Sequence, residues 1–404
     1  MIYLEKRGSE TVEKVIFGEH DANTLRQFEN CLKVGQVVGG VMCADGHYGY
    51  SQPVGGVIVY DNQVAPSGVG YDIACGNKAV KTNLKYDDVK SHIPEIMDEV
   101  EAAIPFGVGV GANSKWGDHD IFNDSAWDVY KELGQHEHDQ LKAMAREQLG
   151  SAGSGNHYVD ILIDEKTEDV WIGNHFGSRG LGHRTATGFL NLAKGLKFLD
   201  PAPRESMEQP PTLLDMDSEL GKLYFSAMEL AGRYAYAGRD IVINQVAHIL
   251  GAKIVQEVHN HHNYAWKETH FGKEYIVVRK GATPALPGQL GFVGGSMGDI
   301  SVILQGVDSE KSRQAFYSTV HGAGRIMSRT KAAGRMNWRT KKRKGGVISE
   351  QDMQQAVRKY GVELRGGGTD ESPFVYRKLK DVLQAHEGTI DILHVLKPIG
   401  VLMD

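Results

Sequence analysis

The stretch Ser67-Gly-Val-Gly-Tyr-Asp-Ile-Ala-Cys-Gly76 places Asp72 and Cys75 three residues apart and between glycines. Glycine permits positive φ and lets the backbone approach a ligand closely, so such a stretch is typical of a loop that binds a phosphate or a metal ion. A carboxylate and a thiolate in this loop can face one point, and a thiolate beside cations stays deprotonated and accepts two metal ions readily. A lone cysteine is more often a small buried apolar residue, so from these residues alone both interpretations of Cys75 remain.

Outward from this stretch, 26 of the 49 glycines lie in four regions, which we expect to be loops that carry the active site. These regions are residues 35–76, 150–182, 281–298 and 322–334. Turn chemistry in an ordinary α+β fold is the alternative for any one of them.

Patterns of both kinds of secondary structure lie between and within these regions. Apolar residues spaced three and four apart predict helices over residues 89–104, 127–149, 219–257 and 349–360. Short β-branched runs predict strands over residues 54–60, 158–163 and 275–278. No internal repeat, linker or Pro/Ser-rich boundary divides the sequence. We therefore expect a mixed α+β fold in which residues 1–404 form a single large catalytic domain.

Composition narrows the class of protein. With 404 residues, 41% hydrophobic and 24% charged, the chain is typical of a globular protein with a large core. Neither a signal-peptide pattern nor a bilayer-length apolar run is found, so we expect a cytoplasmic protein without membrane contact. Three cysteines, Cys31, Cys43 and Cys75, cannot form a closed disulfide framework and suit a reducing compartment. A net charge of -6 argues against nonspecific coating of nucleic acid.

Three histidine contexts supply further metal donors. They are Gly155-Asn-His157, Asn174-His175-Phe-Gly-Ser-Arg179 and Asn260-His-His262-Asn263. One histidine among 17 is more often a surface or core residue than a ligand. Together with Asp72 and Cys75, however, these residues offer enough nitrogen, oxygen and sulfur donors for two metal ions. The donor set does not identify the metal, because intrinsic affinity at such a site favours zinc or copper over manganese.

A histidine that can act as a nucleophile stands in Ser318-Thr-Val-His321-Gly-Ala-Gly-Arg325-Ile-Met-Ser-Arg329. Neutral imidazole can attack phosphorus to form a phosphoramidate, and the arginines that follow can stabilise charge on the transferred group. An incidental histidine in a loop before a helix is the alternative.

The segment of residues 325–344 is strongly basic and contains Trp338 but no acidic residue. A phosphate backbone is its obvious partner, although a charge run is usually only a solvated face. Its basic residues are Arg325, Arg329, Lys331, Arg335, Arg339, Lys341, Lys342, Arg343 and Lys344.

Separated motifs run through the sequence: Asp45-Gly-His47-Tyr-Gly, Val69-Gly-Tyr-Asp72-Ile-Ala-Cys75-Gly, Gly153-Ser-Gly-Asn156-His157, His175-Phe-Gly-Ser-Arg179-Gly, His261-His262-Asn263-Tyr, Arg279-Lys280-Gly281-Ala-Thr, Gly295-Ser296-Met-Gly298 and His321-Gly-Ala-Gly-Arg325. With these motifs the chain resembles the RtcB RNA ligases over essentially its whole length. The resemblance implies an RtcB-like domain that uses GTP and manganese to join RNA 3'-phosphate or 2',3'-cyclic-phosphate ends to 5'-hydroxyl ends. Such an enzyme serves RNA repair or tRNA splicing, and archease is a candidate activating partner.

The resemblance also implies roles for individual residues. Two manganese ions would be held by Asp72, Cys75, His157, His175 and His262, with the Cys75 thiolate bridging them. His321 would be the nucleophile that becomes guanylylated, while Arg179 and Arg325 would contact RNA or nucleotide phosphate. Contacts to the nucleotide would come from Asn156, which reaches a phosphate near the metals, and from Tyr158, Asp160, Ser296, Ser301, Gly322, Ala323 and Gly324.

Some positions depart from the family pattern. The family usually ends in a Lys-Gly pair whose lysine contacts guanine, whereas this chain has Met403-Asp404. Asp160 replaces a glutamate, and Phe176 stands where serine or threonine is common. These changes bear on nucleotide selectivity more than on the chemistry of His321.

Two other functions remain as alternatives. A dinuclear phosphoesterase would use the same metal donors but would need neither His321 nor a nucleotide, so a covalent GMP adduct separates it from a ligase. A noncatalytic RNA-binding paralogue would explain the missing terminal lysine, but intact metal donors and His321 argue against it.

Overall fold

Two β-sheets form the centre of the molecule in the computed structural model, which describes residues 2–7, 10–202, 206–337 and 342–404. The first sheet has the strand order β1 (Ile2–Arg7), β2 (Glu10–Ile16), β3 (Val37–His47), β4 (Val54–Tyr60), β12 (Lys273–Lys280) and β11 (Asn263–His270). The second has the order β10 (Ile254–His261), β6 (Gly76–Lys85), β8 (Asp169–Phe176), β7 (Tyr158–Asp164), β20 (Ile390–Met403), β15 (Ser301–Gly306) and β14 (Leu290–Val293), and β19 (Glu363–Arg365) pairs with β20.

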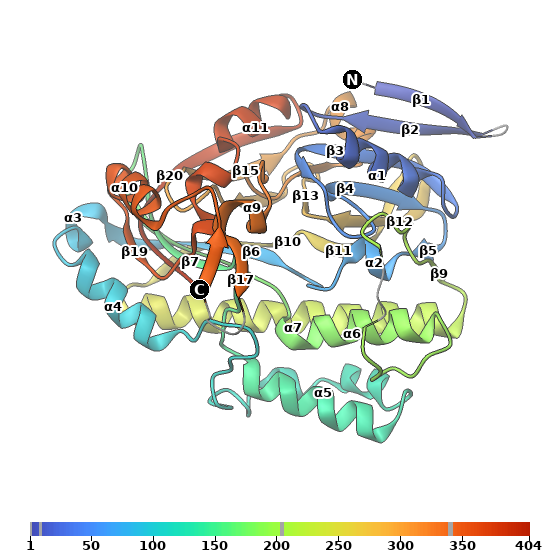
Figure 1. Ribbon diagram of the computed structural model, residues 1–404, viewed down its shortest axis with the longest axis horizontal. Helices are drawn as coiled ribbons and strands as arrows, with labels where there is room; N and C mark the ends of the chain where they lie inside the picture. The colour runs from blue at the N-terminus through green and yellow to red at the C-terminus, as the bar shows by residue number, and fades with distance from the viewer. Residues whose placement is uncertain (1, 8–9, 203–205, 338–341) are drawn as a thin grey trace.

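Smaller pairs of strands and a set of helices surround these sheets (Figure 1). The pairs are β13 (Ala282–Pro284) with β16 (Ser318–Val320), β17 (Gly334–Asn337) with β18 (Lys342–Gly345), and β5 (Gln63–Val64) with β9 (Leu214–Asp215). The α-helices are α1 (Ala22–Leu32), α2 (Pro66–Val69), α3 (Tyr86–Val89), α4 (Ile93–Ala103), α5 (Gln135–Gln148), α6 (Arg179–Leu192), α7 (Glu219–Ile249), α8 (Glu310–Gln314), α9 (Arg329–Ala333), α10 (Glu350–Tyr360) and α11 (Leu379–Ala385). The 3-10 helices are η1 (Asp120–Asn123), η2 (Ser125–Tyr130), η3 (Thr369–Glu371) and η4 (Pro373–Val375).

The long helix α7 supports the second sheet from one side, and α5 lies beyond α7 at the bottom of the view (Figure 1). Val242 and Val246 of α7 are fully buried and share an apolar cluster with Val80 of β6 and Ile172 of β8. Burial of such side chains contributes roughly 1.5–3 kcal/mol each, so this helix fixes β6 and β8 relative to each other. Both strands end beside the candidate site.

Within the first sheet, β4 is buried on both faces. Along β4, Val57 and Val59 enter one apolar cluster, while Ile58 and Tyr60 enter another on the opposite face. Successive strand residues point to opposite sides, which explains why this strand has a continuous apolar sequence rather than an alternating one.

Antiparallel register in the second sheet brings distant parts of the sequence to one edge. His175 of β8 lies opposite both Asn77 of β6 and Tyr158 of β7, and His261 of β10 lies opposite Gly76. The predicted metal donors Cys75, His157 and His262 each flank one of these paired positions. Strand pairing alone therefore gathers residues that are up to 187 positions apart, from Cys75 to His262.

The mixed α and β architecture is confirmed, and so are the three predicted strands, although β7 is one residue longer than expected and β12 has eight residues rather than four. The helix predicted over residues 349–360 is α10, and Ser349 caps it by accepting a hydrogen bond from the Asp352 backbone N–H. The helix predicted over residues 89–104 is α4, which begins only at Ile93, and Val89 is the last residue of α3. In residues 127–149, Gly134 with φ of 147° separates η2 from α5.

Two expectations were wrong. The helix predicted over residues 219–257 ends at Ile249, because Gly251 adopts a positive φ of 62° and the chain then enters β10. The glycine-rich regions are not simply loops, because β3, β4, β7, β8 and β14 run through them. Gly39 lies against the ring of Phe316 and Gly173 against that of Phe292, so these glycines make room for neighbouring side chains within the sheets. Within the described ranges, no helix combines the length and the apolar character needed to cross a membrane.

Candidate functional site

A cavity of about 330 Å³ is lined by residues from both sheets, with His47 and Lys280 from the first sheet and His175 and Asp160 from the second. Most of the residues singled out in the sequence meet there. They are Asp72, Cys75, Asn156, Tyr158, Asp160, His175, His262, Ser296, His321, Gly322, Ala323, Gly324 and Arg325.

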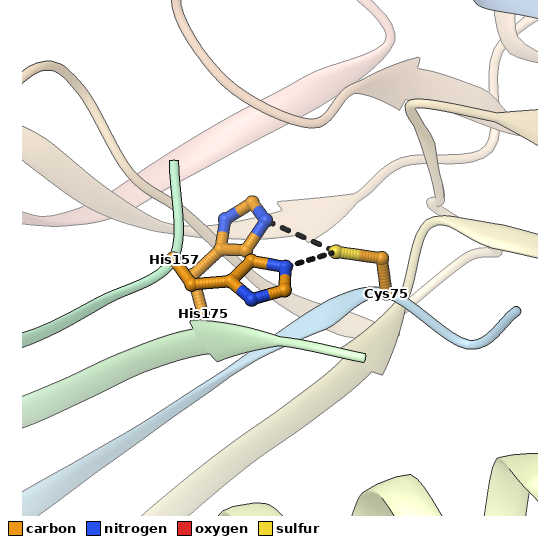
Figure 2. A group of neighbouring side chains, drawn as sticks. All are labelled: Cys75, His157 and His175. Carbon is orange, nitrogen blue, oxygen red and sulfur yellow. Dashed lines mark hydrogen bonds between the residues drawn. The ribbon is translucent and has the colours of Figure 1, made fainter. Parts of the chain in front are cut away.

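A cysteine and two histidines form a tight cluster at this cavity (Figure 2). Cys75 Sγ lies 3.2 Å from Nε2 of His175 and 3.7 Å from Nε2 of His157, and both rings point toward the sulfur. All three side chains are buried, and their ligand atoms lie within 4.8 Å of one another. One sulfur and two imidazole nitrogens in this arrangement can hold a metal ion.

The hydrogen bonds of His157 leave one of its nitrogens suited to a metal. Its Nδ1 lies 2.8 Å from the carbonyl of Ala152, so Nδ1 carries the proton and Nε2 carries the lone pair. This Nε2 lies 3.1 Å from Oδ2 of Asp72. A lone pair that faces a carboxylate requires a proton or a cation between them, which fits a metal ion at this point.

His262 offers a further buried nitrogen that can bind a metal ion. Its Nδ1 lies 3.2 Å from Oδ1 of Asn263, while its buried Nε2 has no hydrogen-bond partner among the described residues. Its ring centroid lies 5.0 Å from that of His175 and 4.9 Å from that of His321. Burial, followed by the charge of His321, lowers the pKa of His262 well below its ordinary value, so the ring is neutral and can act as a ligand.

The sulfur of Cys75 also depends on a cation. Burial raises the pKa of this thiol well above its ordinary value, and the charge of Asp72 raises it further. A bound metal ion reverses this effect because a coordinating thiol is deprotonated. The cluster therefore has the donor types, the tautomers and the unpartnered nitrogen expected of a metal centre, without identifying the metal.

A buried carboxylate orients His321, the predicted nucleophile. Asp45 is fully buried, and its Oδ2 accepts hydrogen bonds from His321 Nδ1 at 2.6 Å, from the His321 backbone N–H at 2.9 Å and from that of Gly322 at 3.2 Å. The Nδ1 proton thus points to Asp45, and Nε2 keeps the lone pair. Burial acts to raise the pKa of Asp45, but the charge and hydrogen bonds of His321 outweigh it and lower that pKa.

Gly324, in the turn after His321, passes too close to Asp45 for any residue with a side chain. Gly324 has a φ of 75°, and a Cβ there would overlap the carbonyl of Asp45. Sequence reasoning missed the role of Asp45, although the residue stands in a motif that carried the resemblance. An isolated aspartate in a strand has no local pattern that connects it with a histidine 276 positions away.

Polar groups without partners mark the end of the cavity formed by β7 and β20. In the described part of the chain, neither Asp160 Oδ1 nor the Tyr158 hydroxyl has a hydrogen-bond partner, although both are buried. Burial raises the pKa of Asp160 well above its ordinary value. Met403 lies opposite Tyr158 in the sheet and also lines the cavity. Phe176 instead packs into the apolar cluster beneath β8.

Three predicted residues are placed differently from the others. Arg179 does not line the cavity, since its guanidinium donates to the carbonyls of Gly107 and Val110 at 3.0 and 3.2 Å. Arg325 lines the cavity, but its guanidinium is engaged by Glu371, Tyr376 and two backbone carbonyls. Ser301 is not among the residues that line the cavity. Its Oγ accepts a hydrogen bond of 3.4 Å from the Gly295 N–H, in the loop between β14 and β15.

The structure adds cavity residues that the sequence did not single out for the site. Lys280 and Arg329 lay within quoted motifs or the basic run, whereas Glu371 and Tyr376 belong to no pattern that would have revealed them. Arg329 forms ion pairs with Asp370 and Glu371, which hold it at the cavity wall. In the rest of the basic segment, Lys331, Arg335 and Lys344 are exposed, while Trp338, Arg339 and Lys341 lie outside the described residues.

Comparisons with known proteins agree on one family. A family model described as "tRNA-splicing ligase RtcB" matches residues 27–404. The chain is 32% identical to "RNA-splicing ligase RtcB" of Escherichia coli over 381 residues, covering 88% of this chain and 87% of that protein. It is 31% identical to "tRNA-splicing ligase RtcB" of Methanococcus maripaludis, covering 99% and 94%, and 31% identical to the protein of the same name from Thermococcus kodakarensis, covering 89% and 86%.

Proposed function

Because the chain belongs to the RtcB family of RNA ligases, we propose that it joins RNA 3'-phosphate or 2',3'-cyclic-phosphate ends to 5'-hydroxyl ends. In this proposal GTP is the cosubstrate, Mn²⁺ is the metal, and His321 carries GMP between the two. Residues 1–404 act as one ligase domain. The single observation that carries the proposal is that His321, oriented by Asp45, shares one cavity with Cys75, His175 and His262.

The first step is guanylylation of His321. The Nε2 lone pair attacks the α-phosphorus of GTP, a P–N bond forms, the bond from the α-phosphorus to its bridging oxygen breaks, and pyrophosphate leaves. Asp45 holds the Nδ1 proton and stabilises the positive charge that develops on the ring. The Gly322-Ala323-Gly324 turn, apart from the Gly322 N–H that donates to Asp45, and the side chain of Ser296 line the same cavity, and we assign them to the phosphate.

The next two steps transfer GMP and seal the RNA. An oxygen of the RNA 3'-phosphate attacks the same phosphorus, the P–N bond breaks, and His321 is released as a neutral imidazole. The 5'-hydroxyl then attacks the 3'-phosphorus, loses its proton, and displaces GMP. A cyclic phosphate must first be opened by water to a 3'-phosphate. We assign Asn156 to positioning the phosphate, and Asp160 and Tyr158 to the base end of the cavity.

Metal ions bound by Asp72, Cys75, His157, His175 and His262 would stabilise charge on phosphoryl oxygens and help orient the attacking groups. The lone pairs of the imidazoles and the unpartnered Nε2 of His262 support this assignment. The family assignment supports manganese, whereas the donor types alone suit several metals.

The direct test is a ligation assay with purified protein and an RNA pair that bears a 2',3'-cyclic phosphate and a 5'-hydroxyl. Reactions with GTP, ATP or no nucleotide, each with and without Mn²⁺, should give product only with GTP and Mn²⁺. A covalent, acid-labile GMP adduct should form without RNA. Release of phosphate from RNA ends without any adduct would instead identify a dinuclear phosphoesterase, and RNA binding without either reaction would identify a noncatalytic paralogue. Adding archease to the same assay tests whether that partner increases turnover.

Replacing Asp45 with asparagine should slow formation of the GMP adduct on the order of 100-fold, because the amide cannot stabilise the imidazolium or select the Nδ1–H tautomer as the carboxylate does. The rate of adduct formation from labelled GTP measures this effect. Asp164→Asn is a matched control, because Asp164 is another buried aspartate bonded to a histidine, His394, but lies outside the cavity lining. A rate for Asp45→Asn equal to that of the control would contradict the orienting role.

Replacing Met403 with lysine should tighten GTP binding on the order of tenfold, because an ammonium beside Asp160 would keep that carboxyl ionised and add a charge-assisted hydrogen bond to the base end. Binding is best measured at equilibrium in the His321→Ala background, where no adduct forms. Met403→Leu is the matched control for side-chain size. Unchanged or weaker GTP affinity in Met403→Lys would refute the idea that Met403 stands in place of a lysine that contacts guanine.

A further inference from the structure

A fully buried guanidinium lies directly behind the proposed metal donors. Arg239 comes from α7, and none of the described carboxylates forms an ion pair with it. Its hydrogen-bond acceptors are instead two backbone carbonyls and two imidazoles, and its guanidinium carbon lies 5.2 Å from the centroid of the Tyr236 ring. Nη1 donates to the Ala74 carbonyl at 3.0 Å and to the Phe176 carbonyl at 2.5 Å, while Nε donates to His259 Nε2 at 2.8 Å and Nη2 to His261 Nδ1 at 2.9 Å.

Three of these partners are sequence neighbours of proposed metal donors. Ala74 precedes Cys75, Phe176 follows His175, and His261 precedes His262. These donors lie at the start of β6, in β8 and after β10. One side chain therefore links the backbone at two donors and the imidazole beside a third, and α7 anchors that side chain against the sheet.

Packing alone does not account for a cation at this position. A buried charge without a carboxylate partner costs several kcal/mol unless hydrogen bonds compensate for it, and an apolar side chain would fill the space without that cost. Burial lowers the pKa of Arg239 only to about 10, so the group remains charged at neutral pH. Every acceptor of its hydrogen bonds lies beside a proposed metal donor or on β10.

The backbone beside Cys75 supplies a second, independent observation. Ala74 has a φ of 61°, a left-handed conformation that is unfavourable for a residue with a side chain. Its carbonyl is the one that Arg239 binds, and its N–H donates to the Asn263 carbonyl at 2.8 Å. Hydrogen bonds to the carbonyl and from the N–H of Ala74 thus hold the backbone conformation that turns Cys75 toward His175.

We propose that Arg239 is a positioning residue of the metal centre, which fixes Cys75, His175 and His262 in the relative arrangement that metal binding requires. The inference rests on the metal site of the proposed function. It assigns Arg239 no contact with the metal, the nucleotide or RNA.

The test compares Arg239→Lys with wild type in the full-length protein. Lysine keeps the charge, but a single ammonium cannot reproduce the planar fork that reaches all four acceptors. The dissociation constant for Mn²⁺, measured by calorimetry, should rise about 10- to 100-fold, as is typical when a group that orients metal ligands is lost. With Co²⁺ as a probe, the thiolate-to-metal absorption band should weaken or shift. Arg279→Lys is the control, because Arg279 is equally buried but binds Glu268, Phe316 and Ser318 instead.

A second pair of variants keeps the proposal testable if Arg239→Lys does not fold. Asparagine at position 261 retains an acceptor near the place of Nδ1, whereas leucine removes it. His261→Asn should therefore keep Mn²⁺ affinity close to wild type, and His261→Leu should weaken it. Affinity within twofold of wild type for Arg239→Lys or for His261→Leu would overturn the proposal, and so would an equal loss in Arg279→Lys.

These measurements use metal ions without GTP or RNA, so they succeed or fail separately from ligation. Normal Mn²⁺ binding by wild type with no ligation would reject the proposed function and leave the role of Arg239 intact. Ligation by wild type together with unaltered metal binding in the variants would support the proposed function and reject the role of Arg239.

Discussion

Replacing His321 with alanine should abolish the covalent GMP adduct and RNA joining together, with adduct formation falling below detection. The expectation follows from the position of His321 in the cavity of the proposed metal donors, because its Nδ1 is committed to Asp45 and its Nε2 keeps a lone pair. Labelled GTP and Mn²⁺, followed by acid lability and mass measurement of the adduct, give the readout. Metal ions and substrate binding do not by themselves yield a covalent GMP adduct, because the variant lacks the side chain that receives the phosphorus of GTP.

Two further variants make this result specific. His321→Asn keeps a polar group that can face Asp45 but has no nucleophilic ring nitrogen, so it should be as inactive as alanine while preserving the local fold. His136→Ala removes an exposed histidine of α5 and should leave adduct formation unchanged. An adduct that persists in both His321 variants would show that the nucleophile is another residue.

Replacing Cys75 with alanine should remove metal binding and ligation together. Cys75 is the only sulfur in the described donor cluster, and the two nearest imidazoles point toward it. Loss of a direct ligand should weaken Mn²⁺ binding by at least about 100-fold, since loss of a group that merely orients a ligand already costs 10- to 100-fold. Calorimetry with Mn²⁺ and elemental analysis of the purified protein measure the effect.

A second buried cysteine provides the comparison. Cys31 is also buried and free, but it packs in the apolar core beside Phe28 and donates to the Ser51 carbonyl. Cys31→Ala should lower stability by about 1 kcal/mol and leave metal content unchanged. Full metal content in Cys75→Ala would refute the assignment of its sulfur as a ligand, whatever the effect on ligation.

Local patterns were sufficient to predict elements whose structure is determined locally. The β-branched run of residues 54–60 is β4, and the serine before residues 350–360 is the cap of α10. The same reasoning extended the 219–257 helix too far, since helical periodicity continues through Val246 and a single glycine, Gly251, decides where the helix ends. It also treated glycines as loop residues, although Gly39 and Gly173 are needed where large rings press against a strand.

The residues of the candidate site also fall into two groups, those that sequence reasoning found and those that it missed. Residue types that are chemically distinctive, such as Cys75, His175 and His321, could be selected from sequence and meet in one cavity. Asp45 and Arg239 could not, because each acts through a partner far along the chain, and buried polar residues of these types are common in sequences without such roles. Their contacts depend on strand register and on the path of α7, which no short window of sequence contains.

The position of β20 has a consequence for biosynthesis. This strand comes last in the sequence, yet it is hydrogen-bonded between β7 and β15 in the interior of the second sheet. A growing polypeptide therefore cannot close the sheet until residues 390–403 have left the ribosome, and until then β7 and β15 expose unpaired edges that invite association with other chains. Premature termination shortly before this strand should yield insoluble protein rather than a smaller active enzyme.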